Sequence, residues 1–490
     1  MQLAPGLTFP PANAPVLKNE EGRTINRDMP TISIIIPTHN RSASLLRTLD
    51  ALRVQTYPLQ QVEVLVVADG CSDGTAERLR HYTAPFALNF IEQTNQGAAA
   101  ARNHGAAYAK GRLLLFLDDD VEPTPPLIKS HISAHQNRPS RVVIGPYPPV
   151  LQGRADFINI FMRTWSETKF LAMRQPSHRY TYRDLLSGNL SLEAELFTRL
   201  GGFDPAFRGC GGEDYEFGVR LIKAGVPFTF ASDALCYHYN HETTDLDRLF
   251  ERMRREGHSD VLIGLRHPEL RPTLPIAHIE AYCASLRYIL RTLSLTLAFR
   301  LPKAGDLSAI PLRRLLDLLE RIRLRGPWLW LCHGLRGYWY CRGVAEELGT
   351  PKALNSFLRN NFNCTNIDAT ESEIDLHDGL EVAEKRLDEE RPAGVRIRYG
   401  QQSVGRIPPQ PGAERLRGVH LRPILATEFA KPLLKALAVE GTTNEFINAD
   451  HLLADFKRAV LCSTHAGDVT DHALYLKRPN KKHIQKNQLI

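Results

Sequence analysis

Three consecutive aspartates, Asp118 to Asp120, follow the apolar stretch LLLFL. Carboxylates this close together repel one another, and burial without a partner raises their pKa values, so a cation is expected beside them. A strand points alternate side chains to the same face, and Asp118 and Asp120 could therefore present oxygen ligands to Mg²⁺ or Mn²⁺. A solvated acidic turn explains the three residues about equally well, because acidic residues are common after strands.

A second acidic pair lies in GGEDYEFG, where glycines precede Glu213 and Asp214 at an expected helix start. A carboxylate exposed there in a cleft could act as a general base. Capping preferences alone would also explain two acids in the first turn of a helix. His238 and His241 follow Asp214 in CYHYNHETT; a single histidine is usually structural, but an imidazole is also a good third ligand for Mn²⁺.

Three further polar segments stand where strands are expected to end. PTHNR offers backbone N–H groups and Arg41 to a nucleotide. VADGCSDGT offers Asp69 to a base N–H, whereas Asp73 is explained more simply as a turn or helix cap. NQGAAAARNHG opens a helix with a glycine and carries Arg102, which could approach a base or a phosphate.

The elements that must position these motifs alternate between strand and helix patterns. This alternation predicts a parallel sheet with covering helices, whose ligands sit at the carboxyl ends of the strands. Each polar motif lies at such an end. Strands are expected at residues 31–38, 62–69, 87–93 and 113–120, and helices at 41–55, 73–82 and 98–110.

Composition divides the 490 residues into five parts. The last part, residues 393–490, contains the segment VRIRYGQQSVGRI, whose alternation around a turn predicts a β-hairpin. The parts are an extended tail at 1–30, an α/β domain at 31–245, a mostly helical and basic amphipathic region at 246–363, an acidic linker or helix at 364–392 and a small α+β segment at 393–490.

The overall composition is that of an ordinary globular protein, with 43% apolar residues and a formal net charge of +7. This mild basic excess suits phosphate-bearing ligands or an anionic membrane face and does not predict binding to nucleic acid. Eight cysteines without a CxxC pair indicate reduced thiols in a cytoplasmic chain. Because neither a signal peptide nor a membrane-spanning segment is evident, we expect a soluble or peripheral protein.

Taken together, the five motifs resemble those of family-2 glycosyltransferases of the GT-A fold, over about residues 31–245. Such enzymes carry a Pro-Thr-aromatic-Asn-Arg opening, a VDDGSTDGT block, an NxGxxxARNxG helix, a DxD motif and a late ED motif. PTHNR, VADGCSDGT, NQGAAAARNHG, LDDD and GGEDYEFG match this pattern. Two departures are Ala68, where an acid is usual, and Cys71, which replaces a serine.

The resemblance implies a role for each matching residue. Asp118 and Asp119 would contact ribose and diphosphate, and Asp214 would be the base that deprotonates the acceptor, with Glu213 the less suited member of the pair. Asp120, together with Asp118 and His238, would hold a divalent metal, Mn²⁺ or Mg²⁺. The nucleotide pocket would consist of Pro37, Thr38, His39, Arg41, Asp69, Asn95, Gly97 and Arg102, with Asp69 reading a uracil or thymine ring.

The expected function is therefore inverting, metal-dependent transfer of a hexose or N-acetylhexosamine from a nucleotide sugar, most simply a UDP-sugar. The acceptor would be a hydroxyl of a glycan or lipid-linked molecule in surface polysaccharide biosynthesis. A sugar-phosphate nucleotidyltransferase is an alternative, although PTHNR is not the Gly-rich signature of that class. A non-catalytic scaffold is another, although it would have no need to keep costly clustered acids.

Two remaining features admit both a functional and a structural reading. Trp165, Tyr180 and Tyr182 could form an aromatic platform for an acceptor sugar, but core packing is the commoner role for each. The basic helical segment 248–325 could lie on an anionic leaflet at the inner face of the membrane. An ordinary amphipathic helical cap is slightly favoured for that segment.

Overall fold

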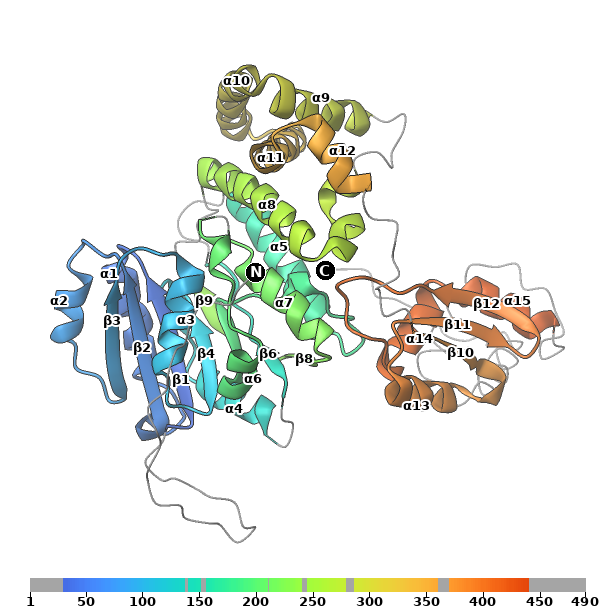
Figure 1. Cartoon of the computed structure of the whole chain (residues 1–490), viewed down its shortest axis with the longest axis horizontal. Coiled ribbons are helices and arrows are strands. Elements are labelled where there is room, and N and C mark those ends of the chain that lie inside the picture. Colours follow the sequence, from blue (N-terminus) through green and yellow to red (C-terminus); the bar gives the residue numbers. More distant parts are fainter. Residues whose placement is uncertain are drawn as a thin grey trace, which may run out of the picture.

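The computed structural model describes residues 30–136, 140–150, 156–209, 211–239, 245–278, 286–359 and 370–439. These residues form an α/β body, a helical body and a small C-terminal unit (Figure 1). The tail expected at 1–30 lies almost wholly outside the described residues, as do His241 and four of the eight cysteines. The four described cysteines, Cys71, Cys236, Cys332 and Cys341, are free thiols.

The α/β body is built on a seven-stranded sheet with the order β3-β2-β1-β4-β7-β6-β8. Of these seven strands, β7 alone runs against the others. The central strands are almost wholly buried, as expected for parallel strands covered on both faces. The strands are Ile32–Thr38 (β1), Val62–Asp69 (β2), Ala87–Gln93 (β3), Leu113–Leu117 (β4), Val142–Ile144 (β6), Asn189–Glu193 (β7) and Phe228–Phe230 (β8).

Helices cover both faces of this sheet, which confirms the predicted fold class. Helices α1, α2 and α4 pack in one core with alternate side chains of β1 and β2. Helices α3, α5, α6 and α7 pack with the opposite side chains. The helices are Ser42–Leu52 (α1), Thr75–Arg80 (α2), Ala98–Tyr108 (α3), Leu127–His135 (α4), Phe157–Arg174 (α5), Ala194–Arg199 (α6) and Glu213–Lys223 (α7).

The three aspartates lie beyond the strand that precedes them. The strand expected at 113–120 ends at Leu117, and Asp118 to Asp120 occupy the turn before the short strand β5 (Val121–Pro123). The three residues are therefore not part of a strand, although oxygen atoms of Asp118 and Asp120 still lie close enough together to share a metal ion, as expected. Strand β5 pairs with β9 (Cys236–His238) in a separate two-stranded sheet, which brings His238 beside the turn.

The helical body contains helices α8 to α12, as predicted, and also takes in one end of α5. Phe157, Ile158 and Met162 of α5 share its core with Trp328. Short 3₁₀ turns at Pro268–Thr273 (η5) and Pro275–His278 (η6) follow the first helix. Within the described residues, the helices lack the combination of length and apolar character that would span a bilayer. The helices are Leu246–Arg266 (α8), Leu286–Arg300 (α9), Pro302–Arg321 (α10), Arg325–Leu348 (α11) and Pro351–Arg359 (α12).

The C-terminal unit is a three-stranded sheet covered by helices on its apolar face. Strands β11 and β12 form the predicted hairpin, and β10 joins β11 in parallel. Residues 371–390, expected within an acidic linker or helix, form β10 and α13 and so belong to this unit. The elements are Glu371–Asp375 (β10), Leu380–Glu390 (α13), Gly394–Tyr399 (β11), Gln402–Ile407 (β12), Gly418–Thr427 (α14) and Ala430–Val439 (α15).

A backbone contact joins the C-terminal unit to the α/β body. The N–H of Tyr182 donates to the carbonyl of Gly412 at 2.8 Å, and the N–H of Glu414 donates to the carbonyl of Tyr180 at 2.8 Å. Gly412 has a φ of +73°, and a Cβ atom there would lie 2.6 Å from the Tyr182 ring. Tyr182 begins the 3₁₀ turn η2 (Tyr182–Asp184), which packs against α7.

Candidate active site

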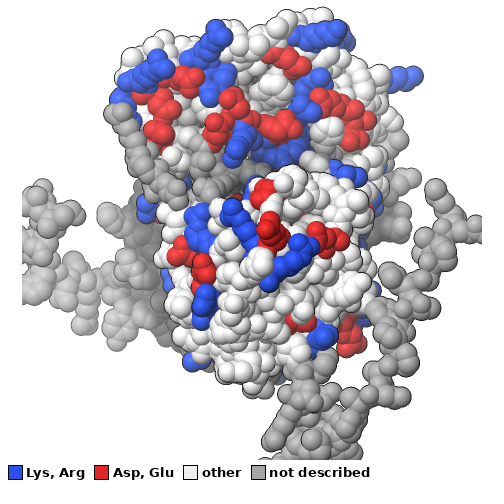
Figure 2. All heavy atoms as spheres, turned by 90° about the vertical axis from the view of Figure 1, so that its left-hand side faces the viewer, with Lys and Arg blue, Asp and Glu red and all other residues white. Residues whose placement is uncertain are grey.

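The carboxyl ends of β1, β2 and β4 open on a cavity of about 490 Å³. Asp120 and Asp214 both line this cavity, so the candidate metal ligand and the candidate base share one space. Charged side chains of both signs gather along the recess between the helical body and the α/β body (Figure 2). Of the predicted site residues, the cavity is lined by Pro37, Thr38, His39, Arg41, Asp69, Arg102, Asp118, Asp119, Asp120, Glu213, Asp214 and His238.

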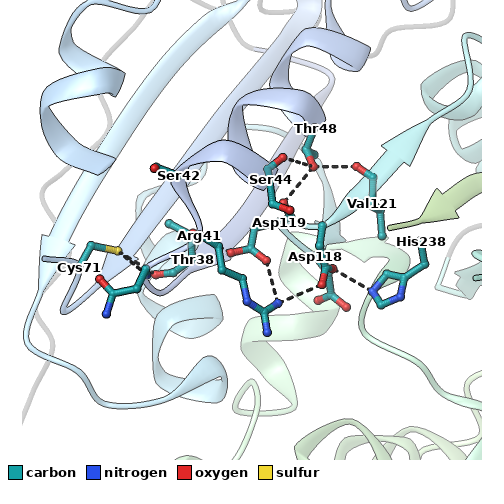
Figure 3. A network of polar contacts seen from close by, with 12 residues as sticks. Thr38, Arg41, Ser42, Ser44, Thr48, Cys71, Asp118, Asp119, Val121 and His238 are labelled. Carbon is teal, nitrogen blue, oxygen red and sulfur yellow. Dashed lines mark hydrogen bonds and ion pairs between the residues drawn. The ribbon is translucent and has the colours of Figure 1, made fainter. Parts of the chain in front are cut away.

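Two arginines and a histidine lie beside the three aspartates of the turn. Arg41 Nη1 is 3.0 Å from an Asp120 oxygen and 3.3 Å from an Asp119 oxygen. His238 Nε2 is 2.8 Å from the other Asp120 oxygen, and Arg102 Nη2 is 2.8 Å from Asp118. Figure 3 shows Arg41 and His238 reaching the aspartate cluster from opposite sides. The cation expected from the sequence is thus supplied, in part, by side chains of the chain itself.

Three side chains of the cluster fit a divalent metal ion. One ligand atom each from Asp118, Asp120 and His238 lies within 4.8 Å of the others. Two carboxylate oxygens and one imidazole nitrogen are a donor set suited to Mn²⁺, and the oxygens also suit Mg²⁺. Gly188 leaves room for this arrangement, because a Cβ atom there would lie 2.5 Å from an Asp118 oxygen.

The middle aspartate, Asp119, ties the turn to the neighbouring elements. Thr38 Oγ1 donates to its carboxylate at 2.6 Å, and Thr48 Oγ1 donates to its backbone carbonyl at 3.1 Å. Burial raises the pKa of Asp119 to about 7, against the opposing effect of Arg41. These contacts fix the turn on β1 and α1, whereas the contact of Asp119 with ribose or diphosphate stays a prediction.

Arg102 connects the aspartate turn to the ED motif. Its side chain is buried, with Nη1 2.8 Å from Glu213 and Nη2 2.8 Å from Asp118. The guanidinium is therefore engaged with two carboxylates, although a nucleotide contact was expected for it. This bridge holds the start of α7 against the end of β4, so Arg102 positions both halves of the site.

The two carboxylates of the ED motif have different partners, because in the part of the chain that the structure describes Glu213 forms an ion pair and Asp214 does not. Glu213 is buried against Arg102, whereas the hydrogen bonds that Asp214 accepts from described residues come from backbone N–H groups, those of Tyr215 at 2.8 Å and Ser187 at 3.4 Å. Burial raises the pKa of Asp214 to about 7, the charge of Glu213 adds to this effect and Arg102 opposes it. A carboxylate with a pKa near neutrality is suited to general base catalysis.

The expected nucleotide pocket is organised by Asp69. Its carboxylate accepts from the N–H of Gln96 at 2.7 Å and the N–H of Gly97 at 2.8 Å, which fixes the start of α3. His39 Nδ1 lies 2.6 Å from the Asp69 carbonyl and 3.2 Å from the Asn95 side chain. Asn95 and Gly97 support the pocket through these contacts without being among the cavity-lining residues. Recognition of a base by Asp69 stays a prediction.

Asp73 has the capping role that was favoured for it. Its carboxylate accepts from the N–H of Thr75 at 3.2 Å, in the first turn of α2. The same side chain accepts from the N–H of Ser42 at 2.9 Å, at the start of α1. Hydrogen bonds from Thr75 and Ser42 outweigh the opposing effect of burial and lower the pKa of Asp73.

Several lining residues come from segments that gave no local signal in the sequence. Trp165 lines the cavity, as the acceptor platform would require, whereas Tyr180 and Tyr182 are buried elsewhere. The helical body adds a wall that sequence reasoning missed, because α8 reaches the cavity only through tertiary packing. The missed lining residues include Tyr147, Phe170, Arg252, Arg255, Glu256 and Ser259.

Comparisons with known proteins point to one family. Residues 33–188 match the model described as glycosyl transferase family 2, and residues 168–242 match one described as the N-terminal domain of galactosyltransferase. Validoxylamine A glucosyltransferase of Streptomyces hygroscopicus subsp. jinggangensis is 34% identical over 270 residues, 50% of this chain and 63% of that protein. Chondroitin synthase of Escherichia coli is 26% identical over 236 residues, 42% of this chain and 34% of that protein.

The mannosyltransferase PcManGT from Pyrobaculum calidifontis aligns with a TM-score of 0.42 and 22% identity, covering 65% of this chain and 87% of that one. The chain spans 63% of the length of the first glucosyltransferase and 59% of a second one from the same species. Both family matches fall on the α/β body and its strand-end motifs, so the resemblance of this chain to family-2 glycosyltransferases lies in that domain.

Proposed function

We propose that the chain transfers a sugar from a nucleotide-sugar donor to a hydroxyl group of a glycan or lipid-linked acceptor, with a divalent metal and with inversion. The observation that carries this proposal is the shared cavity: the three candidate metal ligands and Asp214 face one space, and Arg102 joins the two groups. We place the reaction in the cytoplasm, in surface polysaccharide assembly. The free thiols of the described cysteines are consistent with that compartment.

The metal site accounts for the departure of the nucleoside diphosphate. A divalent ion held by Asp118, Asp120 and His238 would stabilise the negative charge that develops on the leaving diphosphate. Arg41 has 38% of its side chain exposed and pairs with two aspartates of the same turn. Its guanidinium is thus placed to bind a donor phosphate beside the ion.

Asp214 accounts for activation of the acceptor. Its carboxylate would take the proton of the acceptor hydroxyl while that oxygen attacks the anomeric carbon and the bond to the diphosphate breaks. In-line displacement of this kind inverts the anomeric centre. Glu213 cannot easily share the role, because Arg102 holds it as a buried ion pair. Its negative charge instead helps to keep the pKa of Asp214 near neutrality.

For the donor we propose a UDP-hexose or UDP-N-acetylhexosamine. Relatives named validoxylamine A glucosyltransferase, chondroitin synthase and hyaluronan synthase support a hexose-type sugar. Trp165 on the cavity wall could stack on an acceptor sugar ring. Arg252 and Arg255 of α8 add positive charge to the lining of the same cavity, which favours an acceptor or donor group with negative charge.

Calorimetry with Mn²⁺ and a panel of UDP-, GDP- and dTDP-sugars tests the donor and the metal together. Wild-type protein should bind a UDP-sugar in the presence of Mn²⁺, and Asp120→Ala should lose metal and donor affinity together. The exposed residue Asp233 provides the matched control, and Asp233→Ala should bind as wild type does. Equal donor affinity for Asp120→Ala and wild type would refute the metal assignment.

Slow hydrolysis of the donor tests the class of reaction. NMR of the sugar released from a UDP-sugar should show inversion at the anomeric carbon. If GDP- or dTDP-sugars react and UDP-sugars do not, the donor is not a UDP-sugar, while the assignment of the site residues still stands. Release of the original anomer would contradict the inverting mechanism.

A further inference from the structure

Helix α10 (Pro302–Arg321) is apolar on two sides. One side is buried in the core of the helical body, through Ala309, Leu316 and Leu319. The opposite side is open to solvent, where Leu307 is 66% exposed and Leu318 51% exposed. Helices at the surface of a globular protein usually turn polar side chains to solvent, so this second apolar side needs an explanation.

At 100° per residue, the exposed apolar residues of α10 and its C-terminal cap fall on one side of the helix, together with three cations. We call this set the α10 outer face. All of these residues are exposed. The outer face consists of Lys303, Leu307, Ile310, Arg314, Leu315, Leu318, Arg321 and Ile322.

The acidic residues of α10 are engaged in contacts with other side chains or backbone groups, and Asp317 lies at the edge of the outer face, next to Ile310 around the helix at 100° per residue. Asp306 accepts from Tyr338 at 2.6 Å, Asp317 accepts from Arg313 at 2.6 Å, and Glu320 accepts from the N–H of Phe157 at 2.6 Å. The outer face itself contains three cations and no acidic residue. Beyond the helix, the basic and apolar character continues in exposed Arg323, Leu324, Arg325 and Trp330.

This combination of charge and apolar surface fits an anionic lipid bilayer. Aliphatic side chains can enter the boundary between headgroups and acyl chains, while arginine and lysine keep their charged ends at the lipid phosphates. Each surface Lys or Arg contributes about 1 kcal/mol near an anionic leaflet. Tryptophan is also favoured at that interface, as Trp330 would be.

A second copy of the chain is a less suitable occupant. A two-fold symmetric contact would place the same patch on itself, and the cations of the outer face would then meet like charges. None of the eight residues of the outer face is acidic, and Asp317 at its edge is already paired with Arg313. We propose that the α10 outer face docks this protein on an anionic membrane surface.

The position of α10 relates this surface to the active site. The helical body carries α10 on its outside, while α8 of the same body lines the catalytic cavity with Arg252 and Arg255 (Figure 1). If the proposed glycosyl transfer holds, docking through α10 would bring the cavity near lipid-linked acceptors. The docking itself does not depend on that reaction, so the two proposals can fail separately.

Flotation of the full chain with lipid vesicles tests the docking surface. Wild-type protein should bind vesicles that contain about 30% phosphatidylglycerol and should not bind vesicles of pure phosphatidylcholine. The variant Leu307→Glu/Leu318→Glu removes apolar contact and introduces repulsion, so its partition should fall at least tenfold. Arg314→Glu/Arg321→Glu reverses two cations and should also lower binding at least tenfold, because two contributions of about 1 kcal/mol are lost.

A matched control and a fold check accompany these variants. Val382 is 56% exposed on α13 of the C-terminal unit, so Val382→Glu places the same charge on a different surface and should bind vesicles as wild type does. Far-ultraviolet circular dichroism and the unfolding midpoint should match wild type for all variants, because every altered side chain is exposed.

Three outcomes would overturn the proposal. Wild-type protein that floats with neither vesicle type has no lipid-docking face. Equal binding to neutral and anionic vesicles, or equal loss in Val382→Glu, would show that the cations and the position of the outer face do not matter. Self-association that Leu307→Glu/Leu318→Glu abolishes, without vesicle binding, would identify a second copy as the occupant.

Discussion

Two short acidic segments of this chain behave differently, one within a strand and the other in the turn that follows a strand. In the C-terminal unit, β10 has the sequence ESEID, and its acids Glu371, Glu373 and Asp375 face the arginines of β11 and β12. In the α/β domain, β4 leads directly into Asp118, Asp119 and Asp120. Both sets satisfy a simple search for closely spaced carboxylates.

Burial separates the two sets. Hydrogen bonding from Arg406 lowers the pKa of Glu371, which stays ionised and accessible to salt. Burial raises the pKa of Asp119 and of Asp214 instead. The acids of β10 form an exposed ladder of ion pairs, which contributes little to stability. The buried acids are harder to ionise, and carboxylates with pKa values raised in this way are typical of functional sites. The comparison teaches that acid spacing identifies a site only when the fold removes the acids from water.

The largest expected effect concerns the base. Asp214→Asn should lower the rate of donor turnover by about 10²- to 10⁴-fold, because a positioned base contributes about that much. Donor affinity should stay near that of wild type, since the change leaves the aspartate turn intact. Steady-state assay of nucleotide release and calorimetry measure the two quantities. A rate within threefold of wild type would remove Asp214 from the mechanism.

The next effect concerns the buried cation. Arg102→Met leaves Asp118 and Glu213 without their shared partner, which should cost about 3 kcal/mol of unfolding free energy. Arg398→Met, in the exposed ladder, should cost less than about 1 kcal/mol. Urea unfolding of both variants measures the contrast. Equal costs would contradict the distinction between the two acidic sets.

A third effect is a dependence of stability on pH. The folded-state pKa of Asp214 is about 7 and exceeds the ordinary value of 3.8, so the folded protein keeps a proton that the unfolded chain releases. Stability therefore falls as pH rises from about 4 to about 7. Asp214→Asn lacks this loss and should unfold at a higher temperature than wild type at pH 8, while the two should converge near pH 4. Parallel thermal unfolding curves at both pH values would contradict the raised pKa.

The smallest effect is expected in the exposed ladder. Glu371→Gln removes a carboxylate from Arg396 and Arg406 on the surface of the C-terminal unit. Solvent and salt screen this pair, so the unfolding midpoint should move less than in Arg102→Met, and the difference should vanish in about 1 M salt. A loss of stability that stays the same in high salt would contradict the view that these ion pairs are screened by solvent at the surface.

Much of the α/β domain could be predicted because its signals are local. Buried β-branched runs identified β1 and β2. The polar residues after strands and the glycine-led helix start pointed to the aspartate turn and to Asp214 as site candidates, and their chemical roles stay predictions. The predicted hairpin of the C-terminal unit was also correct, because its pattern alternates around a turn.

The remaining features depend on contacts between distant segments. Residues 371–375 become a strand only by pairing with β11, and no local pattern distinguished them from a linker. Arg252 and Arg255 reach the cavity only because α8 packs over the α/β domain. The hydrogen bonds of Asp69 to Gln96 and Gly97 likewise follow from the loop geometry before α3.

The contact between Gly412 and Tyr182 has a practical consequence for anyone who shortens this chain. Tyr182 starts the turn that supports α7, the helix whose first residues are Glu213 and Asp214. A version that stops before residue 370 would leave the Tyr180–Tyr182 backbone facing water beside α7. The C-terminal unit therefore supports the candidate site from outside the α/β body, and its removal is expected to weaken that site.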